Sequence, residues 1–318
     1  MNSSFASAEQ FPLKVIRRRG LVDRVREGAI PPVHVQFLPM NRCNLKCGFC
    51  SCKARDRGQE MTLEQAREML QTFTRLGMES MTITGGGEPC LWEPLSQFIG
   101  LTVREGVGVG LVTNGTMLTR LTPTAVEQLC WCRISCSDEA NRISGFWTVV
   151  ESAQTVDWAF SYVLTAKPNI ENFIAHVKFA RAHGFTHVRA VGDIIDLEHA
   201  PDFEGIKAAA QEAAGDMPVI YQTRQRFVRG AKRCLISLLK PVVGPDGKLY
   251  PCCGTQYARS EMDLSLPDAM CMGLVEEARQ IWARQLCFDG AGCERCYYEA
   301  YNGLLELLGE HLQHEAFV

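Results

Sequence analysis

The 15 cysteines of this 318-residue chain constrain its structure more than any other feature, because many of them gather in two groups. In the first group, MNRCNLKCGFCSC, the residues Cys43, Cys47 and Cys50 have the spacing C-x3-C-x2-C. In the second group, far along the chain, Cys293 and Cys296 form C-x2-C. Cysteines grouped at such spacings in a reduced protein indicate bound metal rather than disulfides.

The hydropathy of the chain predicts where the protein works. The N-terminal MNSSFASAEQFPLKVIRRRG lacks the apolar core of a secretory signal. The sequence also contains no run of about eighteen apolar residues, so no transmembrane helix is expected. We therefore expect a protein of the reducing cytoplasm with no membrane partner. The net charge of −3 excludes a polycation made for nucleic acid, so any nucleic-acid site would be a local patch.

Short apolar runs alternate with helical patterns over the first two thirds of the chain. Six such alternations predict a parallel sheet with right-handed crossovers. The expected strands are 33–38, 80–84, 107–113, 132–137, 159–165 and 187–191. The expected helices are 63–76, 123–129, 169–183 and 202–214. Polar turns after the second and third strands mark the edge where an active site would form.

After about residue 230 the pattern changes to segments rich in Gly, Pro and Cys. A turn is predicted at Gly244–Gly247, and a helix is predicted at 297–312. This segment has too few long apolar runs for a core of its own, so a bound metal would help to hold it together.

The first cysteine group can hold a cluster with one open position. Three thiolates on one loop bind three irons of a [4Fe–4S] cluster and leave the fourth iron free for another ligand. A zinc site with four closed ligands is the alternative, in which Cys52 supplies the fourth thiolate.

Residues 33–192 resemble the radical SAM superfamily, named for S-adenosylmethionine (SAM). The C-x3-C-x2-C motif follows the first predicted strand and has an aromatic residue, Phe49, before its last cysteine. After the second strand, GGGEP at 85–89 looks like the family's GGEP motif, and Thr113-Asn114-Gly115 is similar to its strand-end polar motif. The resemblance implies a SAM-cleaving [4Fe–4S] cluster held by Cys43, Cys47 and Cys50.

The same resemblance implies which residues bind SAM. The GGEP-like turn would hold the amino group, the strand-end motif would face the ribose, and serines of the fourth strand would add polar contacts. Arg142 would pair with the carboxylate, with an exposed loop arginine as the equal alternative. The implied SAM-binding residues are Gly85, Gly86, Gly87, Glu88, Pro89, Thr113, Asn114, Ser135, Ser137 and Arg142.

The family's chemistry follows from this resemblance. One electron from a flavodoxin- or ferredoxin-type donor cleaves SAM, and the resulting 5′-deoxyadenosyl radical abstracts hydrogen from a substrate carbon. The resemblance therefore implies an enzyme of the isomerase or oxidoreductase type. No further catalytic side chain is predicted.

The second cysteine group resembles the start of the SPASM motif of radical SAM enzymes, because its first members fit C-x12-G-x4-C around Gly247. No cysteine follows Cys296, so the resemblance is to the shorter twitch version, which holds one auxiliary [4Fe–4S] cluster. The implied ligands are Cys234, Cys252, Cys293 and Cys296. A four-cysteine zinc ribbon is the alternative, and the possible replacements for a ligand are Cys253, Cys271 and Cys287.

Together these features predict an α/β fold, a partial (β/α)6 TIM barrel followed by a small twitch-like iron–sulfur domain. The expected division is an N-terminal extension at 1–30, the radical SAM barrel at 31–230 and the auxiliary-cluster domain with its C-terminal helix at 231–318. We expect the substrate to lie between the barrel mouth and the auxiliary domain.

Two basic segments bear on the substrate, with Tyr221 and Phe227 close to the second. They could follow a phosphate backbone while the aromatic side chains stack on bases, and two solvated helix faces are the alternative. Their cations are Lys14, Arg17, Arg18, Arg19, Arg24 and Arg26, and then Arg224, Arg226, Arg229, Lys232 and Arg233.

The run HVQFLPMNRCNLKCGFCSCKARDR resembles radical SAM proteins encoded by bacteriophages, some of which are associated with hypermodified thymine. This resemblance implies an isomerase that rearranges an amino-acid-substituted thymine in phage DNA, in the host cytoplasm. The alternatives are peptide modification, dehydrogenation of a small-molecule alcohol, and a zinc protein that binds nucleic acid.

Overall fold

A curved sheet of ten strands organises the protein, whose computed structural model describes residues 10–138, 146–196, 203–222, 228–259, 264–265 and 267–310. The strand order is β10-β9-β8-β1-β2-β3-β4-β5-β6-β7, and β1 to β7 run parallel to their neighbours. These seven strands are β1 (His34–Phe37), β2 (Ser80–Ile83), β3 (Gly108–Thr113), β4 (Trp131–Ser137), β5 (Asp157–Leu164), β6 (His187–Gly192) and β7 (Val219–Gln222).

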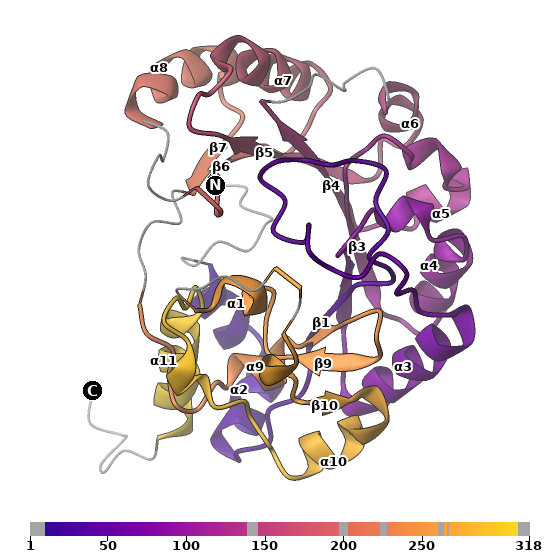
Figure 1. Ribbon diagram of the computed structural model, residues 1–318, viewed down its shortest axis with the longest axis vertical. Helices are drawn as coiled ribbons and strands as arrows, with labels where there is room; N and C mark the ends of the chain where they lie inside the picture. Colours follow the sequence, from indigo (N-terminus) through magenta and orange to yellow (C-terminus); the bar gives the residue numbers. More distant parts are fainter. Residues whose placement is uncertain are drawn as a thin grey trace.

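Six helices follow these strands along the chain and lie on the outer side of the sheet (Figure 1). In α3, Thr62 and Gln65 form a capping box, and Gly77 ends the helix with φ 102°. The apolar side of α3 packs into the core through Met69, Leu70 and Phe73. The six helices are α3 (Leu63–Leu76), α4 (Leu95–Arg104), α5 (Pro123–Glu127), α6 (Trp147–Ser152), α7 (Ile170–Ala182) and α8 (Phe203–Ala214).

The two faces of the sheet differ in burial, because side chains alternate along each strand. On β4, Cys132 and Ile134 are fully buried, whereas Arg133 and Ser135 on the other face are half-buried. The fully buried set points towards the outer helices and joins the core. The inner face of the sheet is therefore the one that solvent or a ligand can reach.

The C-terminal segment extends the same sheet. The strand β8 (Val242–Val243) pairs parallel to β1, β9 (Lys248–Tyr250) pairs antiparallel to β8, and β10 (Gly273–Leu274) pairs antiparallel to β9. Gly247 has φ 74°, which suits the turn between β8 and β9. The remaining helices are α1 (Phe11–Ile16), α2 (Arg19–Arg26), α9 (Ile236–Leu239), α10 (Ala278–Ala283) and α11 (Glu299–Gly309).

The predicted fold class, a partial α/β barrel, is confirmed, and the sheet is not closed, because β7 and β10 lie at opposite ends of the strand order. The six predicted strand–helix units are present as β1 to β6 with α3 to α8, and β7 adds a further parallel strand after β6. Side chains from residues 234–239 belong to the main core together with the barrel residues. The division at residue 231 stays a prediction. No helix in the described part of the chain is long and apolar enough to cross a membrane.

Candidate functional site

The loop that carries the first cysteine group leaves β1 at the carboxyl edge of the parallel sheet. Cys43, Cys47 and Cys50 are half-buried, in contrast to the core cysteines. The backbone N–H of Leu45 donates to the Cys43 Sγ at 3.4 Å, and Cys50 N donates to the Cys47 carbonyl at 3.2 Å. Burial raises the pKa of the Cys43 thiol. The three thiols are therefore on one short, partly accessible loop.

Cys52 lies against this loop and interacts with Cys50. The Cys50 thiol donates to Cys52, which raises the pKa of Cys50 and lowers that of Cys52. The Arg55 guanidinium adds to the lowering of the Cys52 pKa and opposes the rise of the Cys50 pKa. Cys52 Sγ is also 4.0 Å from the carbonyl oxygen of Gly85, so this thiol touches the glycine-rich turn.

The glycine-rich turn at 85–87 packs directly on the backbone that enters the cysteine loop. Gly87 N donates to the Met40 carbonyl at 3.0 Å, and a Cβ on Gly87 would lie 2.0 Å from the Arg42 carbonyl oxygen. A Cβ on Gly86 would lie 1.9 Å from Asn41 Oδ1. Glycine is required here because the two loops approach each other closely.

Glu88 ties this turn to the end of β3 rather than facing an open space. It is 1% exposed, and its Oε1 accepts from Cys90 N at 3.0 Å and from Thr113 Oγ1 at 2.5 Å. Its Oε2 accepts from Asn114 N at 2.7 Å. The carboxylate thus accepts three hydrogen bonds from the protein, which hold the turn against the end of β3.

Asn114 links the β3 end to the cysteine loop. Its Nδ2 donates to Asn44 Oδ1 at 3.0 Å and lies 3.9 Å from Cys43 Sγ. Thr113 is buried, and its hydroxyl donates to Glu88, so its side chain helps to fix the position of that carboxylate. The predicted SAM-binding segments after β2 and β3 therefore converge on the cysteine loop.

The other predicted SAM residues lie on or beyond β4. Ser135 is on the accessible inner face, whereas Ser137 is 1% exposed. Pro89 is buried and begins the short helix η1 (Pro89–Leu91). Arg142 lies outside the described residues.

Arg55 and Gln256 join the cysteine loop to the C-terminal segment. Arg55 Nη2 donates to Gln256 Oε1 at 3.1 Å, and Gln256 Nε2 donates to Ser51 Oγ at 3.2 Å. Both side chains are buried, and the Arg55 Nε and Nη1 atoms have no hydrogen-bond partner. Sequence reasoning missed this pair, although a cation five positions after Cys50 was a visible signal.

The four predicted ligands of the second group surround one small cavity, with Cys234, Cys252, Cys293 and Cys296 all in its lining. Backbone N–H groups donate to two of the sulfurs, from Gly254 to Cys252 at 3.3 Å and from Tyr298 to Cys296 at 3.4 Å. The pKa of Cys234 is raised to about 12, mainly by burial and in part by Cys296 and Cys293. The structure thus brings together thiols from three distant segments.

None of the three possible replacements is among the residues that line this cavity. Cys253 is exposed and 3.1 Å from the Tyr298 hydroxyl, Cys271 bonds to Gly273, and Cys287 packs at the edge of the core. In the described ranges, no three His, Cys, Asp or Glu side chains are arranged around a single metal-ion position. Cys130, which belongs to neither group, is exposed immediately before β4.

Asn302 of α11 supports the second group, and sequence reasoning missed it. It is 1% exposed, its Oδ1 accepts from Ile236 N at 2.8 Å, and its Nδ2 lies 3.9 Å from Cys234 Sγ. A polar residue within an otherwise apolar helical pattern was the only available signal.

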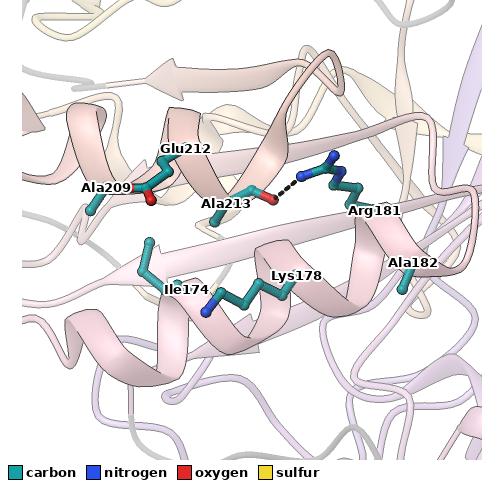
Figure 2. A pocket seen from close by; sticks show the side chains of 7 residues that line it. All are labelled: Ile174, Lys178, Arg181, Ala182, Ala209, Glu212 and Ala213. Atoms are coloured by element: carbon teal, nitrogen blue, oxygen red, sulfur yellow. Dashed lines mark hydrogen bonds between the residues drawn. The ribbon is translucent and has the colours of Figure 1, made fainter.

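A separate pocket lies outside the barrel between α7 and α8 (Figure 2). It is lined by Lys178, Arg181 and Glu212 among others, and Arg181 Nη1 donates to the Ala213 carbonyl at 3.5 Å. No cysteine lines it. This pocket is therefore separate from both cysteine groups.

Sequence comparison gives the first independent identification. Residues 37–136 match the family model of the radical SAM superfamily. The chain is 36% identical over 85 residues to a GTP 3′,8-cyclase of Aquifex aeolicus, covering 24% of this chain and 26% of that protein. It is 33% identical over 104 residues to an S-adenosylmethionine-dependent nucleotide dehydratase of Siniperca chuatsi, covering 31% and 28%. The matches thus span under a third of these two relatives' length.

Solved structures share the fold over most of the chain. The Streptococcus suis protein SuiB bound to its precursor peptide SuiA has a TM-score of 0.59 at 13% identity, covering 94% of this chain and 78% of SuiB. The protein anSMEcpe with bound AdoMet and a peptide has a TM-score of 0.52 at 15% identity, covering 91% and 86%. At these identities the likeness concerns the fold alone.

The family match covers the cysteine loop, the glycine-rich turn and the β3 end that the structure brings together, and fold neighbours carry bound AdoMet. The cysteines of the second group fit an auxiliary cluster. Residues 37–136 therefore match the radical SAM superfamily, whose cofactors are a [4Fe–4S] cluster and SAM.

Proposed function

We propose that this protein is a radical SAM enzyme whose Cys43, Cys47 and Cys50 hold the SAM-cleaving cluster and whose second cysteine group holds an auxiliary [4Fe–4S] cluster. The convergence of the cysteine loop, the turn at 85–87 and Asn114 at the carboxyl edge of the sheet carries this proposal. When bound, the cluster and SAM supply a 5′-deoxyadenosyl radical that abstracts hydrogen from a substrate carbon.

The residues at the first site fit these cofactors. Three half-exposed thiols on one loop match a cluster with an open iron. The Arg55 Nε and Nη1 donors are buried without a partner, and they belong to a cation that acts on Cys50 and Cys52. Donors placed beside thiolates can bond to sulfur and stabilise a reduced cluster. Buried donors left unpaired are costly, so a sulfur acceptor here explains their position.

The second site fits a closed cluster. Four thiols around one cavity satisfy all four irons, so this site has no open position for substrate. We propose that the auxiliary cluster exchanges electrons with the substrate. The first electron comes from an external donor, for which we propose a flavodoxin or ferredoxin type.

For the substrate, we propose a nucleotide or a nucleotide unit, as for the similar GTP 3′,8-cyclase and nucleotide dehydratase. The finer hypothesis, rearrangement of an amino-acid-substituted thymine in phage DNA by an isomerase, stays a prediction. The basic residues of α1 and α2 are exposed, which is compatible with a nucleic-acid partner, while Arg224, Arg226 and Phe227 lie outside the described residues. Peptide modification and alcohol dehydrogenation remain the alternatives to test.

Cys47→Ala tests the proposal, with Cys130→Ala as the matched control because Cys130 is exposed and outside both groups. In anaerobic, iron-loaded protein with SAM and dithionite, we expect Cys47→Ala to abolish 5′-deoxyadenosine formation and Cys130→Ala to retain it. Chromatographic detection of 5′-deoxyadenosine gives the measurement. Undiminished formation by Cys47→Ala, or zinc in place of iron in the wild-type protein, would refute the assignment.

A further inference from the structure

The inner face of the barrel carries cations that the proposed cofactor sites do not use. Arg133 on β4 and Arg189 on β6 both lie on this face and are half-buried, with β5 between them. Lys240 lies just before β8, next to β1 in the sheet. We propose, building on the function above, that Arg133, Arg189 and Lys240 form an anion site that binds a phosphate group of the substrate.

The strand register brings the two arginines towards one point. Arg133 pairs with Ala159, and Ala159 pairs with His187. Arg133 is therefore level with His187, two positions before Arg189. Ser135 and Ser161 continue the next row to Arg189. Two strand spacings separate the arginines by about 10 Å across the sheet, a gap that two long side chains can close on one anion.

Neighbouring strands leave room for these side chains. Between the arginines, β5 presents only Ala159 and Ser161, both small. On the other side, a Cβ on Gly110 of β3 would lie 2.1 Å from the Trp131 ring. Gly110 therefore makes space for the Trp131 indole on the inner face.

Both guanidinium groups are oriented by neighbours. Arg133 lies over the Trp131 ring at 5.5 Å, which engages the face of the guanidinium and not the N–H groups along its edge. Arg189 donates from Nη2 to Gln222 Oε1 on β7. These contacts fix the orientation of the two planar guanidinium groups, whose shape suits the recognition of phosphate.

The electrostatics of the nearby groups agree with a site for an anion. The pKa of His187 is lowered to about 4, mainly by burial and in part by Arg133 and Arg189. The pKa of Lys240 is lowered by desolvation, and both arginines contribute. The thiols of Cys253 and Cys252 act on Lys240 in the opposite direction, and Lys240 in turn lowers the pKa of Lys14. A phosphate would relieve this concentration of positive charge.

The position suits a substrate rather than SAM. Arg133 and Arg189 are the third residues of their strands, below the carboxyl edge where the cysteine loop lies. Arg189 also acts on Tyr301 of α11, and Lys240 lies over the Tyr298 ring at 5.5 Å. The site is therefore between the sheet and the C-terminal segment, where a substrate could extend downward from the radical.

Binding of a matched pair of probes tests the proposal in anaerobic, cluster-loaded, SAM-bound protein. Thymidine 5′-monophosphate and thymidine differ only by the phosphate, and inorganic pyrophosphate probes the anion alone. By titration calorimetry we expect the nucleotide to bind about tenfold or more tightly than the nucleoside, since charge-assisted bonds contribute that much. Arg133→Gln and Arg189→Gln should each weaken nucleotide binding by about tenfold and remove the preference.

Two kinds of variant control for folding and for charge. Arg133→Lys and Arg189→Lys keep the charge and should retain part of the preference. Arg181→Gln removes an arginine from the outer pocket between α7 and α8 and should bind like the wild type. Equal binding of nucleotide and nucleoside by the wild type, or a preference that survives both glutamine variants, would overturn the phosphate site.

The remaining outcomes separate this site from the proposed function. Binding of neither phosphorylated probe would overturn the site. A peptide without phosphate that binds as tightly as the nucleotide, and loses binding in the same variants, would reassign it to a carboxylate. The wild-type protein's 5′-deoxyadenosine formation tests the proposed function alone, because that assay needs no substrate phosphate.

Discussion

The two cysteine groups differ in how the chain brings their thiols together. The first group places three half-exposed thiols on one short loop at a sheet edge. The second draws its thiols from three distant segments around a small cavity, with Cys234 buried and supported by Asn302. A local motif thus suits an open, reactive cluster, whereas an assembly of distant segments suits a closed cluster that also holds the fold together.

Removing one ligand from the second group gives the largest effect that distinguishes the two. Cys293→Ala should lower the iron content by about four atoms per chain and spare the first cluster, because the groups share no ligand. Iron and sulfide analysis with EPR spectroscopy provides the measurement. Cys271→Ala, a half-buried cysteine outside the cavity lining, is the control. An unchanged iron count in Cys293→Ala would contradict the auxiliary cluster.

A change at Glu88 probes the first group without touching a ligand. Glu88→Gln replaces an acceptor by a donor opposite Thr113 or Asn114, and one unpaired buried group costs about 1–3 kcal/mol. We expect SAM affinity to fall about tenfold as Asn114 loses its position against the cysteine loop. Equilibrium dialysis with labelled SAM measures it. The exposed Glu93→Gln should bind SAM normally, and equal affinity in both variants would show that Glu88 does not position the site.

Asn302 offers the corresponding test of the second group. Asn302→Leu leaves the Ile236 N–H buried without an acceptor, so the free energy of unfolding should fall by about 1–3 kcal/mol. Loss of the Nδ2 donor near Cys234 should also lower the reduction potential of the auxiliary cluster alone. Thermal unfolding and redox titration measure the two effects. Gln280→Leu, at an exposed position of α10, should change neither, and a shift confined to the first cluster would contradict the assignment.

The smallest expected effect concerns the barrel interior between the groups. His187 is buried with a pKa of about 4, against about 6.5 when unfolded, so it stays neutral in the native state. Its contribution is complete above pH 6.5 and is lost as the pH falls towards 4. Between pH 7.5 and 5.5 the protein should therefore lose about 1 kcal/mol more stability than His187→Gln. Urea unfolding at both pH values measures this difference, and identical pH slopes would show that His187 titrates normally.

The sequence predicted features that depend on local chemistry better than those that depend on distant contacts. The helix at 63–76 was predicted at its observed bounds, because Thr62 and Gln65 form its cap and Gly77 ends it. The helix α4 was missed, since Gly100 and Val103 weaken its local signal while Phe98 and Ile99 are buried in the core. The four-residue strand β7 was too short to stand out.

Pairings between distant segments were beyond any local pattern. No local pattern near β8 predicts that Val242 pairs with Gln36 of β1, because the register between non-consecutive strands depends on the completed fold. The Arg55–Gln256 bond between the cysteine loop and the C-terminal segment was hidden for the same reason. By contrast, the inner arginine of β4 was visible in the alternation of Cys132, Arg133 and Ile134, a period of two that separates the faces of the strand.

The pairing of β1 with β8 has a consequence for synthesis of the chain. The backbone of β1 bonds to Pro241 and Val243, some two hundred residues later, through Gln36 N and Leu38 N. A ribosome delivers the first strand long before its partner, so one edge of β1 stays uncovered while the intervening barrel is being made. An uncovered edge invites pairing with other nascent chains, and closing so long a loop is slow.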